Sequence, residues 1–392
     1  MDKQITIGIP IEKTPWTGGL NYLRSLVLAT NSVSEELGAR ILIVTSIGNS
    51  ENLKSSFPNN TIIESKWLGK IGPHKVLRVL LRRLLGNDTV LSHYLRRQGI
   101  DILSHGAPLG VGAEVPSITW IPDFQHVHLP QYFSKDVLEE RETSLRRACR
   151  DATKIVLSSD SAYRDFSKLS PQSVQKASVL RFVSLPPTQP DQDSAATLDY
   201  LGLRGRRFIY MPNQMWIHKN HILVFKAVRE ISKKHPDILV VTTGEKSDFR
   251  SPNHPATLEQ YVAENNLEKN IRILGSVKYS EVSTLFWNCH GVINPSRFEG
   301  WSTSVEEAKT LCKPLALSSL DVNREQTSGN ARFFDCDSVE ECVHALESVW
   351  NQSSCLPNVD LIMSRYRVSQ KEFGSAFLGI ATKAIESHGK RI

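Results

Sequence analysis

Two glutamates, Glu299 and Glu307, lie eight positions apart in the chain. Between them the segment combines a glycine, a tryptophan and three hydroxyl side chains: Gly300, Trp301, Ser302, Thr303 and Ser304. The pattern predicts a helix that starts near residue 304, so the amides of 302–304 would lie at a helix N-terminus, where unpaired N–H groups favour a phosphate. Carboxylates accept hydrogen bonds from hydroxyl groups. The segment could therefore hold a sugar hydroxyl, a diphosphate and a ribose in succession.

Both glutamates also have a purely structural interpretation. Thr303 with Glu306, and Ser304 with Glu307, fit the Ser/Thr-x-x-Glu capping box, in which the glutamate only closes the start of its own helix. Glu299 beside a glycine fits an ordinary turn. From the spacing alone, both interpretations stay open.

The flanking elements place these residues at one edge of a predicted parallel sheet. Residues 291–294 are typical of a short buried strand that Pro295 ends, and residues 304–311 are typical of a helix. Lys313-Pro314 closes that helix, and 315–317 begin another strand. Such strand–loop–helix–strand units build parallel sheets, and open α/β sheets bind ligands at the carboxyl edge of their strands. We therefore expect an α/β protein with doubly wound sheets.

A second candidate segment, residues 212–221, joins a predicted strand to a predicted helix. Lys219 stands near the helix start, where it could meet a diphosphate as a point charge. An isolated lysine in such a place is usually a plain surface residue. Asn213 opens the same segment.

Glycines after two other predicted strands could bring the backbone close to a ligand. Gly18 and Gly19 follow a first strand at 5–9 and precede a helix predicted from about residue 22. Gly275-Ser276 lies at the end of a strand near 271–277. Glycine allows close approach and positive φ, but a simple tight turn explains both places equally well.

The loop at 120–133 is the most polar and aromatic part of the N-terminal half. It contains Asp123, His126 and His128, and the two histidines would share one face if the segment were extended. No carboxylate or cysteine is placed to complete a metal site, so we predict none. A loop at a strand end that bears Asp and His is a better candidate for contacts to a transferred sugar and an acceptor.

Length and composition narrow the class of protein. At 392 residues the chain exceeds what one core normally supports, so two domains are expected. The breaker-rich stretch at 186–194 is typical of a linker. A net charge of +6 is too mild to indicate nucleic acid, and six scattered cysteines are typical of reduced thiols in the cytosol. The N-terminus is typical of a strand and not of a signal peptide, and no apolar stretch is long enough to span a membrane.

Positive charge gathers in residues 66–97. Its basic side chains, with Asp88 as the only acid among them, are Lys66, Lys70, Lys75, Arg78, Arg82, Arg83, Arg96 and Arg97. Apolar side chains interleave with them: Val76, Leu77, Val79, Leu80, Leu81, Leu84 and Leu85. A basic amphipathic helix can lie on an anionic membrane, but a surface helix with a solvated basic face fits the pattern slightly better.

Taken together, these motifs resemble the family 4 (group 1) glycosyltransferases. Residues 295–314 resemble the family's Pro-Ser-x-x-Glu-Gly-x…Glu-Ala…Gly-Lys-Pro signature, with Cys312 in place of the usual glycine. Residues 212–221 contain its His-Lys-Asn phosphate motif, with Asn213 where many relatives carry arginine. Residues 120–133 resemble the Asp-x-Gln-His-x-x-x-Pro-x-x-Phe variant of a bacterial branch, with Pro122-Asp123 where most relatives have His-Asp.

The resemblance implies a GT-B fold, two doubly wound Rossmann-like domains facing across a cleft. Residues 1–186 would bind the acceptor, 187–369 the nucleotide sugar, and a helix at 370–392 would return to the first domain. The implied activity is retaining, metal-independent and cofactor-free transfer of a hexose from a nucleotide-diphosphate sugar. The implied acceptor is a glycan or a lipid-linked sugar in bacterial surface-polysaccharide or lipopolysaccharide synthesis. We expect a cytoplasmic protein, with contact of 66–97 with the inner membrane face left open.

The resemblance also implies individual roles. Glu299 would orient the sugar hydroxyls, Lys219 would neutralise the diphosphate with Arg297 in reserve, and Glu307 would bind the ribose. Asp123 and His126 would contact the transferred sugar and the acceptor. Gly18 and Gly19 would lie near the donor phosphate and the acceptor. Gly275 and Ser276 would border the base. Two other functions stay open. One is a GT-B nucleotide-sugar epimerase or hydrolase, and the other, which Asn213 and Pro122 keep open, is a non-catalytic subunit that binds a partner glycosyltransferase.

Overall fold

The computed structural model describes residues 4–12, 17–69, 72–189, 194–248, 250–353 and 358–389. The chain forms two compact units. Unit 1 comprises Met1–Phe124, Lys135–Val183 and Arg367–Ile392, and unit 2 comprises Gln125–Ser134 and Ser184–Tyr366. Residues 125–134, which the sequence led us to place in the first domain, therefore belong to unit 2, and the change of unit after Val183 precedes the predicted linker.

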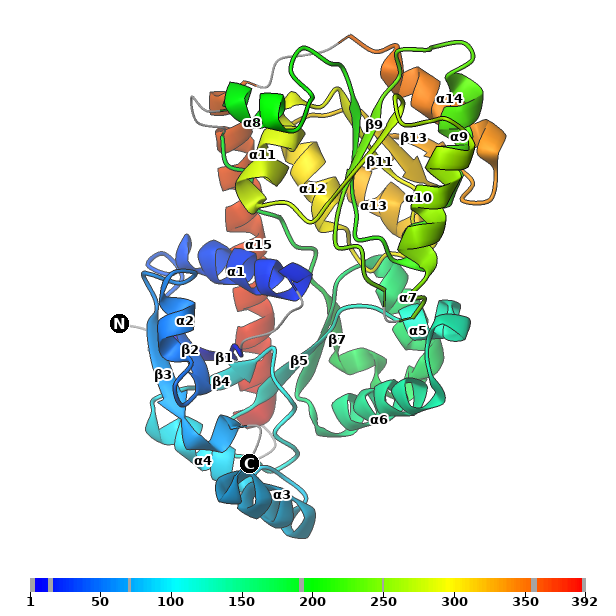
Figure 1. Ribbon diagram of the computed structural model, residues 1–392. Helices are drawn as coiled ribbons and strands as arrows, with labels where there is room; N and C mark the ends of the chain where they lie inside the picture. Colours follow the sequence, from blue (N-terminus) through cyan, green and yellow to red (C-terminus); the bar gives the residue numbers. More distant parts are fainter. Residues whose placement is uncertain are drawn as a thin grey trace. The chain divides into compact units, whose positions relative to one another are not determined.

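Unit 1 is built on a seven-stranded parallel sheet in the order β3-β2-β1-β4-β5-β6-β7. Its strands are β1 (Ile5–Pro10), β2 (Ala39–Ser46), β3 (Thr61–Ser65), β4 (Ile102–Ser104), β5 (Ser117–Ile121), β6 (Lys154–Leu157) and β7 (Ala177–Val179). Its helices are α1 (Thr17–Asn31), α2 (Ser50–Lys54), η1 (Lys66–Leu68), α3 (Pro73–Leu85), α4 (Thr89–Arg97), α6 (Lys135–Asp151), α7 (Asp160–Leu169) and η3 (Pro171–Lys176). Near-continuous apolar runs such as 41–44 form these strands because helices cover both faces of the sheet (Figure 1).

Unit 2 is built on a six-stranded parallel sheet in the order β10-β9-β8-β11-β12-β13. Its strands are β8 (Ile209–Pro212), β9 (Val240–Thr243), β10 (Ile271–Gly275), β11 (Gly291–Asn294), β12 (Leu315–Ser318) and β13 (Arg332–Phe334). Its helices are α5 (Gln125–His128), η2 (Pro130–Tyr132), α8 (Ser194–Tyr200), η4 (Ile217–Lys219), α9 (His221–Ile231), α10 (His254–Glu264), α11 (Tyr279–Asn288), α12 (Thr303–Thr310), α13 (Asp321–Thr327) and α14 (Val339–Trp350). Two apolar clusters fill the space between this sheet and its helices.

The last helix, α15 (Val359–Gly389), begins in unit 2 and ends in unit 1. In unit 1 it packs on α1, where Gly374 lies so close to the carbonyl oxygen of Ala29 that an added Cβ would be 2.2 Å from it. On the same helix, the buried ring of Phe373 lies 6.4 Å from that of Tyr22 in α1, and the buried ring of Phe377 lies 5.7 Å from that of His105. Among the described residues, no helix is long and apolar enough to cross a membrane.

Both sheets confirm the expected α/β class with doubly wound, Rossmann-like parallel strands. In each unit the strand order runs outward in both directions from a first strand, β1 in unit 1 and β8 in unit 2. The order therefore reverses between β1 and β4, and between β8 and β11. Ligands bind open α/β sheets at such a switch point, outside the carboxyl ends of the strands.

Candidate functional site

The switch point of unit 2 brings together two residues that lie 80 positions apart in the chain. Lys219 follows β8 and Glu299 follows β11, and these two strands are hydrogen-bonded neighbours. The Nζ atom of Lys219 donates to Oε1 of Glu299 at 2.7 Å. The two side chains are only 14% and 8% exposed, so this ion pair is largely screened from water.

Asn294, the last residue of β11, fixes the position of Glu299 through hydrogen bonds. Its fully buried side chain donates through Nδ2 to Oε1 of Glu299 at 3.1 Å and to Oγ of Ser302 at 3.2 Å. Its Oδ1 accepts from Oγ of Ser296 at 2.6 Å. Asn294 thus fixes the positions of Glu299 and of the following helix start, a role that the sequence analysis did not assign to it.

The start of α12 offers fewer amides for a phosphate than the three that the sequence led us to expect. Ser302 is the N-cap residue, and its Oγ accepts from the amide of Val305 at 3.4 Å. The amide of Ser302 donates to Oε1 of Gln326 at 3.1 Å and is therefore engaged. The amides of Thr303 and Ser304 have no hydrogen-bond acceptor within the described part of the chain. Two of the three predicted amides thus remain for an anion.

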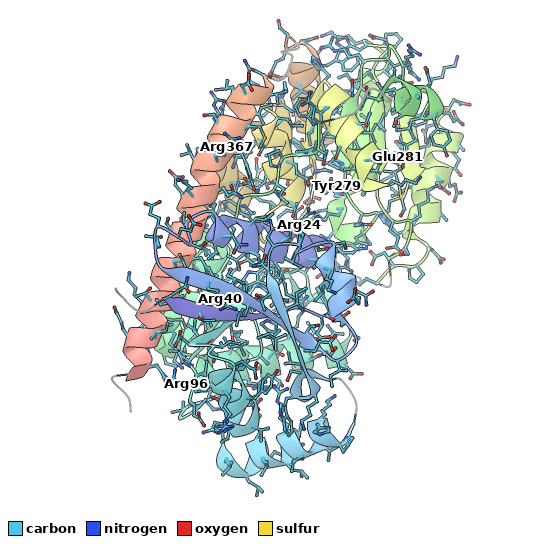
Figure 2. The ribbon with its side chains drawn as sticks, turned by 90° about the vertical axis from the view of Figure 1, so that its left-hand side faces the viewer. Arg24, Arg40, Arg96, Tyr279, Glu281 and Arg367 are labelled. Atoms are coloured by element: carbon cyan, nitrogen blue, oxygen red, sulfur yellow. The ribbon has the colours of Figure 1, made fainter. Side chains whose placement is uncertain are left out.

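Glu307 is not a capping residue, because Ser302 caps the helix. Glu307 is buried, and its Oε1 accepts from the hydroxyl of Tyr279 at 3.3 Å. Burial raises the pKa of Glu307 to about 8, since the charged form loses its hydration. Tyr279 is half exposed at the start of α11 and is labelled in Figure 2. The sequence analysis did not identify Tyr279 as a partner of Glu307.

The neighbouring Glu306 has a structural role. Its Oε1 accepts from Nζ of Lys309 at 2.8 Å and from Nε2 of Gln326 at 2.9 Å. Burial raises the pKa of Glu306 above its usual range, and the hydrogen bonds from these partners oppose that shift. Gln326 therefore ties both the cap of α12 and its first turn to α13.

The turn around Lys219 is fixed by backbone contacts to the 295–302 loop. Asn220 adopts a left-handed conformation with φ +55°, and its Nδ2 donates to the carbonyl of Pro295 at 3.3 Å. The amide of Arg297 donates to the carbonyl of His218 at 2.8 Å. Burial, with the nearby charge of Lys219, lowers the pKa of His218 to about 2, so that this histidine is neutral beside the lysine.

Gly244, which follows β9, contacts both Asn213 and Gly275. An added Cβ on Gly244, where φ is +144°, would lie 2.3 Å from the carbonyl oxygen of Asn213, so only glycine fits there. The amide of Gly244 donates to the carbonyl of Gly275 at 2.9 Å. Asn213 itself is buried and uncharged, so it cannot supply the positive charge that an arginine would bring. Ser276 is exposed beside Gly275.

Among the described residues, no recorded contact joins Arg297 to the Lys219–Glu299 pair. Its Nη1 lies 2.6 Å from Oδ1 of Asp337. Burial by itself lowers the pKa of Arg297, but the hydrogen bond and charge of Asp337 outweigh it, and the pKa is raised. Asp335, Cys336 and Asp337 bring three possible metal-ligand atoms within 4.8 Å of one another, but this group is mostly exposed and Arg297 already pairs with it.

The glycine-rich segment of unit 1 is helical and not a loop. Gly18 and Gly19 lie in the first turn of α1, which begins at Thr17 and not near residue 22 as predicted. Residues 13–16 of this segment lie outside the described residues. The two glycines are thus placed at a helix N-terminus after β1, where the first backbone amides have no partner within the helix.

The predicted Asp123 and His126 cluster is divided between the two units. Asp123 belongs to unit 1, and its Oδ1 accepts from Nη1 of Arg141 at 3.2 Å. His126 and His128 lie on α5, so they point about 200° apart around the helix axis and not to one face as an extended segment would allow. The ring of His128 lies 5.2 Å from that of Phe298, next to Glu299. This segment therefore reaches the 295–302 loop through His128.

Arg250 also went unnoticed in the sequence. Its Nη1 donates to Oε1 of Gln125 at 3.2 Å, and its guanidinium lies 4.8 Å from the ring centroid of Trp216. Asp248 pairs with Arg250 at 3.1 Å and accepts from the amide of Ile217 at 2.8 Å. Arg250 thus joins α5 to the turn that carries Lys219, and no local pattern signals such a long-range contact.

The switch point of unit 1 is filled by aromatic side chains. The hydroxyl of Tyr22 and Nε2 of His105 lie 2.7 Å apart, and Tyr22 stacks on Trp120 with ring centroids 4.0 Å apart. His105 follows β4 with φ +62°, a conformation that few non-glycine residues adopt. Burial lowers the pKa of His105 to about 3. The sequence analysis assigned no role to His105.

One family model matches within unit 2. Residues 201–359 match the family model "Glycosyl transferases group 1". The whole sequence has no significant match among curated proteins.

Solved structures share the fold over nearly the whole chain. A glycosyltransferase from Rickettsia africae is 16% identical with a TM-score of 0.64, covering 99% of this chain and 98% of that one. Anabaena HepE, solved with UDP-glucose, is 13% identical with a TM-score of 0.64, covering 99% and 100%. WaaG, a glycosyltransferase involved in lipopolysaccharide biosynthesis, is 11% identical with a TM-score of 0.58, covering 94% and 95%. The fold is therefore GT-B, and the family model that matches within unit 2 is one of glycosyltransferases.

Proposed function

We propose that this protein is a retaining, metal-independent hexosyltransferase of family 4. Its donor is a nucleotide-diphosphate sugar, and its acceptor is a glycan or lipid-linked sugar in the synthesis of a bacterial surface polysaccharide or lipopolysaccharide. The observation that carries the proposal is the Lys219–Glu299 pair beside the start of α12. It lies at the switch point of the unit that matches the glycosyltransferase model.

The pair fits a donor in which the sugar is directly bonded to a diphosphate. The β-phosphate would take the place of Glu299 as the partner of Lys219, and it would also accept from the amides of Thr303 and Ser304. Glu299, released from the lysine, would then accept hydrogen bonds from the sugar hydroxyls. Preorganised donors aimed at a leaving group stabilise its developing charge, which is what departure of a nucleoside diphosphate requires. Lys219 and the two amides supply the positive charge that a divalent metal would otherwise bring.

Glu307 and Tyr279 fit the ribose. A buried carboxyl with its pKa raised to about 8 is largely protonated at neutral pH, and hydrogen bonds from ribose hydroxyls would favour its charged form. Donor binding would therefore release a proton, and donor affinity should rise with pH up to about 8. Gly275 and Ser276, which follow β10, are proposed to border the base.

The sugar and acceptor ends of the reaction are proposed for residues of the 123–134 region and of unit 1. His126 and Asp123 would contact the transferred sugar and the acceptor, and Gly18 and Gly19 at the start of α1 would contact phosphate and acceptor. Arg297 remains a reserve charge for the diphosphate, available if its contact with Asp337 opens. The neighbours solved with UDP-glucose and named for lipopolysaccharide biosynthesis make UDP-hexoses the first donors to test.

The test is a ligand screen followed by a transfer assay. Thermal unfolding is measured with UDP-, GDP- and dTDP-hexoses, since a ligand stabilises only the state that binds it. We expect one nucleotide to raise the melting temperature of the wild type and of Lys226→Ala, an exposed control on α9, but much less that of Lys219→Ala. Sugar turnover without any acceptor would indicate an epimerase or hydrolase instead. Tight donor binding with no transfer to any acceptor would indicate a non-catalytic subunit.

A further inference from the structure

Helix α3 of unit 1 is turned with its apolar side away from the protein. All thirteen residues of this helix are described, and none of them is buried. Val76, Leu80 and Leu84 are 60%, 52% and 80% exposed. Because residues four positions apart lie on one face of a helix, these three form a continuous stripe. Leu77 is also exposed and completes this stripe.

The basic residues of the opposite side hold the helix to unit 1. Arg78 lies 2.7 Å from Asp88, and Arg82 contacts both Asp88 at 3.3 Å and Asp151 at 3.0 Å. The Nη1 atom of Arg78 also donates to the carbonyl of Trp67 at 2.6 Å. Both aspartates are buried, so these ion pairs are partly desolvated. The expectation of a solvated basic face is therefore wrong for Arg78 and Arg82, which point inward, whereas the exposed Lys75 and Arg83 agree with it.

This orientation leaves the apolar stripe of α3 exposed to water, which is energetically unfavourable. An ordinary surface helix places its apolar stripe on the core and its charges outside. In α3 the ion pairs replace apolar packing as the attachment, and the residues of the stripe do not join the apolar cluster of this part of unit 1. A contiguous exposed apolar patch on a helix marks a binding surface.

The charges around the stripe select the class of partner. Neither α3 nor α4 contains an acidic residue over its described length. Lys75 and Arg83 on α3 are exposed, as are Lys66 on η1 and Arg96 and Arg97 at the end of α4. Figure 1 shows α3 and α4 side by side, and Arg96 is labelled in Figure 2. An apolar helix face with cations around it matches a bilayer surface that carries anionic headgroups.

We propose that α3 is a membrane-docking helix whose stripe, defined by Val76, Leu77, Leu80 and Leu84, inserts into the interface of an anionic bilayer. Insertion of the apolar side chains contributes most of the free energy of membrane binding. The exposed cations add electrostatic attraction to the anionic headgroups. The inward ion pairs of Arg78 and Arg82 keep the stripe facing outward. This inference does not depend on the proposed transfer reaction, because it concerns a surface outside the nucleotide site of unit 2.

The test is flotation of the full chain with vesicles of phosphatidylcholine and phosphatidylglycerol. The variant Leu77→Ser/Leu80→Ser/Leu84→Ser should bind ~100-fold more weakly or worse, because three apolar side chains no longer enter the lipid. The matched control is Ile47→Ser/Val111→Ser, which changes two similarly exposed side chains (68% and 66%) elsewhere on unit 1 and should bind as the wild type does. Arg83→Gln should weaken binding modestly, and only at low salt.

Two further measurements test whether the stripe enters the bilayer. Leu84→Trp should show a blue shift of tryptophan emission when vesicles are added, and an unchanged spectrum would overturn the inference. The triple variant should melt at the wild-type temperature, because its changed side chains are exposed. Equal flotation of triple variant and wild type would also overturn it. So would a wild-type dimer in solution that ignores vesicles and that the triple variant dissociates, since the stripe would then cover a second copy of this chain.

Discussion

The two units present the same topological feature with different chemistry. In unit 1 the strand order reverses between β1 and β4, and in unit 2 between β8 and β11. Unit 1 fills this place with the Tyr22–His105 hydrogen bond and a stacked Trp120. Unit 2 fills it with the Lys219–Glu299 ion pair.

The difference shows that topology offers a site without deciding its use. At the switch point of unit 1, burial keeps His105 neutral, and Tyr22 is buried too. At that of unit 2, two opposite charges hold each other in a place where a diphosphate and a sugar could separate them. We therefore expect changes in unit 2 to act on turnover and changes in the aromatic cluster of unit 1 to act on stability.

The largest expected effect is that of Lys219→Ala. It should lower kcat/KM for transfer by ~10²–10³-fold, because the leaving diphosphate loses its main positive partner. Steady-state kinetics with the donor found in the screen would measure it, and Lys226→Ala should leave turnover unchanged. A folded Lys219→Ala protein with normal turnover would remove the phosphate assignment and the contrast between the units.

The next effect concerns the pH dependence of stability and depends on Glu307. Its raised pKa means that the folded protein keeps a proton that the unfolded chain releases above pH 4.5. The free energy of unfolding should therefore fall by up to ~1.4 kcal/mol per pH unit between 4.5 and about 8, and level off above that.

Denaturant unfolding across this window would test the role of Glu307. Glu307→Gln should lose this part of the slope, while Glu372→Gln, an exposed control, should keep it. In transfer assays, Glu307→Gln should raise the donor KM more than it lowers kcat. An unchanged pH slope in the glutamine variant would show that this carboxyl is already ionised in the folded protein.

The smallest effect is expected in the aromatic cluster of unit 1. Tyr22→Phe keeps the stacking on Trp120 but removes the hydrogen bond to His105, so it should lower the free energy of unfolding by ~1 kcal/mol. The exposed Tyr200→Phe is the control and should have no effect. Donor KM should not change in either variant. A large rise in donor KM for Tyr22→Phe would mean that the two switch points are not as different as their contacts suggest.

Much of unit 2 could be predicted from local pattern. The helix expected at 304–311 is α12 at Thr303–Thr310, and the flanking strands lie where the apolar runs placed them. The capping-box interpretation of Glu307 was wrong because another hydroxyl residue, Ser302, lies two positions before Ser304 and caps the helix instead. Sequence spacing cannot choose among neighbouring hydroxyls, since the choice depends on the path of the preceding loop.

Residues that support the site through distant contacts could not be predicted. Gln326 binds the cap of α12 from 24 positions away, and Arg250 reaches Gln125 across 125 positions. The inward turn of Arg78 and Arg82 was equally hidden, because an amphipathic pattern fixes two faces but not which one meets the protein. Asp151, on another helix, makes that choice.

The sequence by itself determined the parallel α/β architecture and the identity of Lys219, Glu299 and Glu307 as candidates, because strand periodicity, breakers and helix starts are local properties. Only the tertiary structure decided that Lys219 and Glu299 pair, that Glu307 is buried against Tyr279, and that α3 exposes its leucines. Those outcomes depend on which strands become neighbours and on where buried charges find partners, and both are set by contacts between residues far apart in the chain.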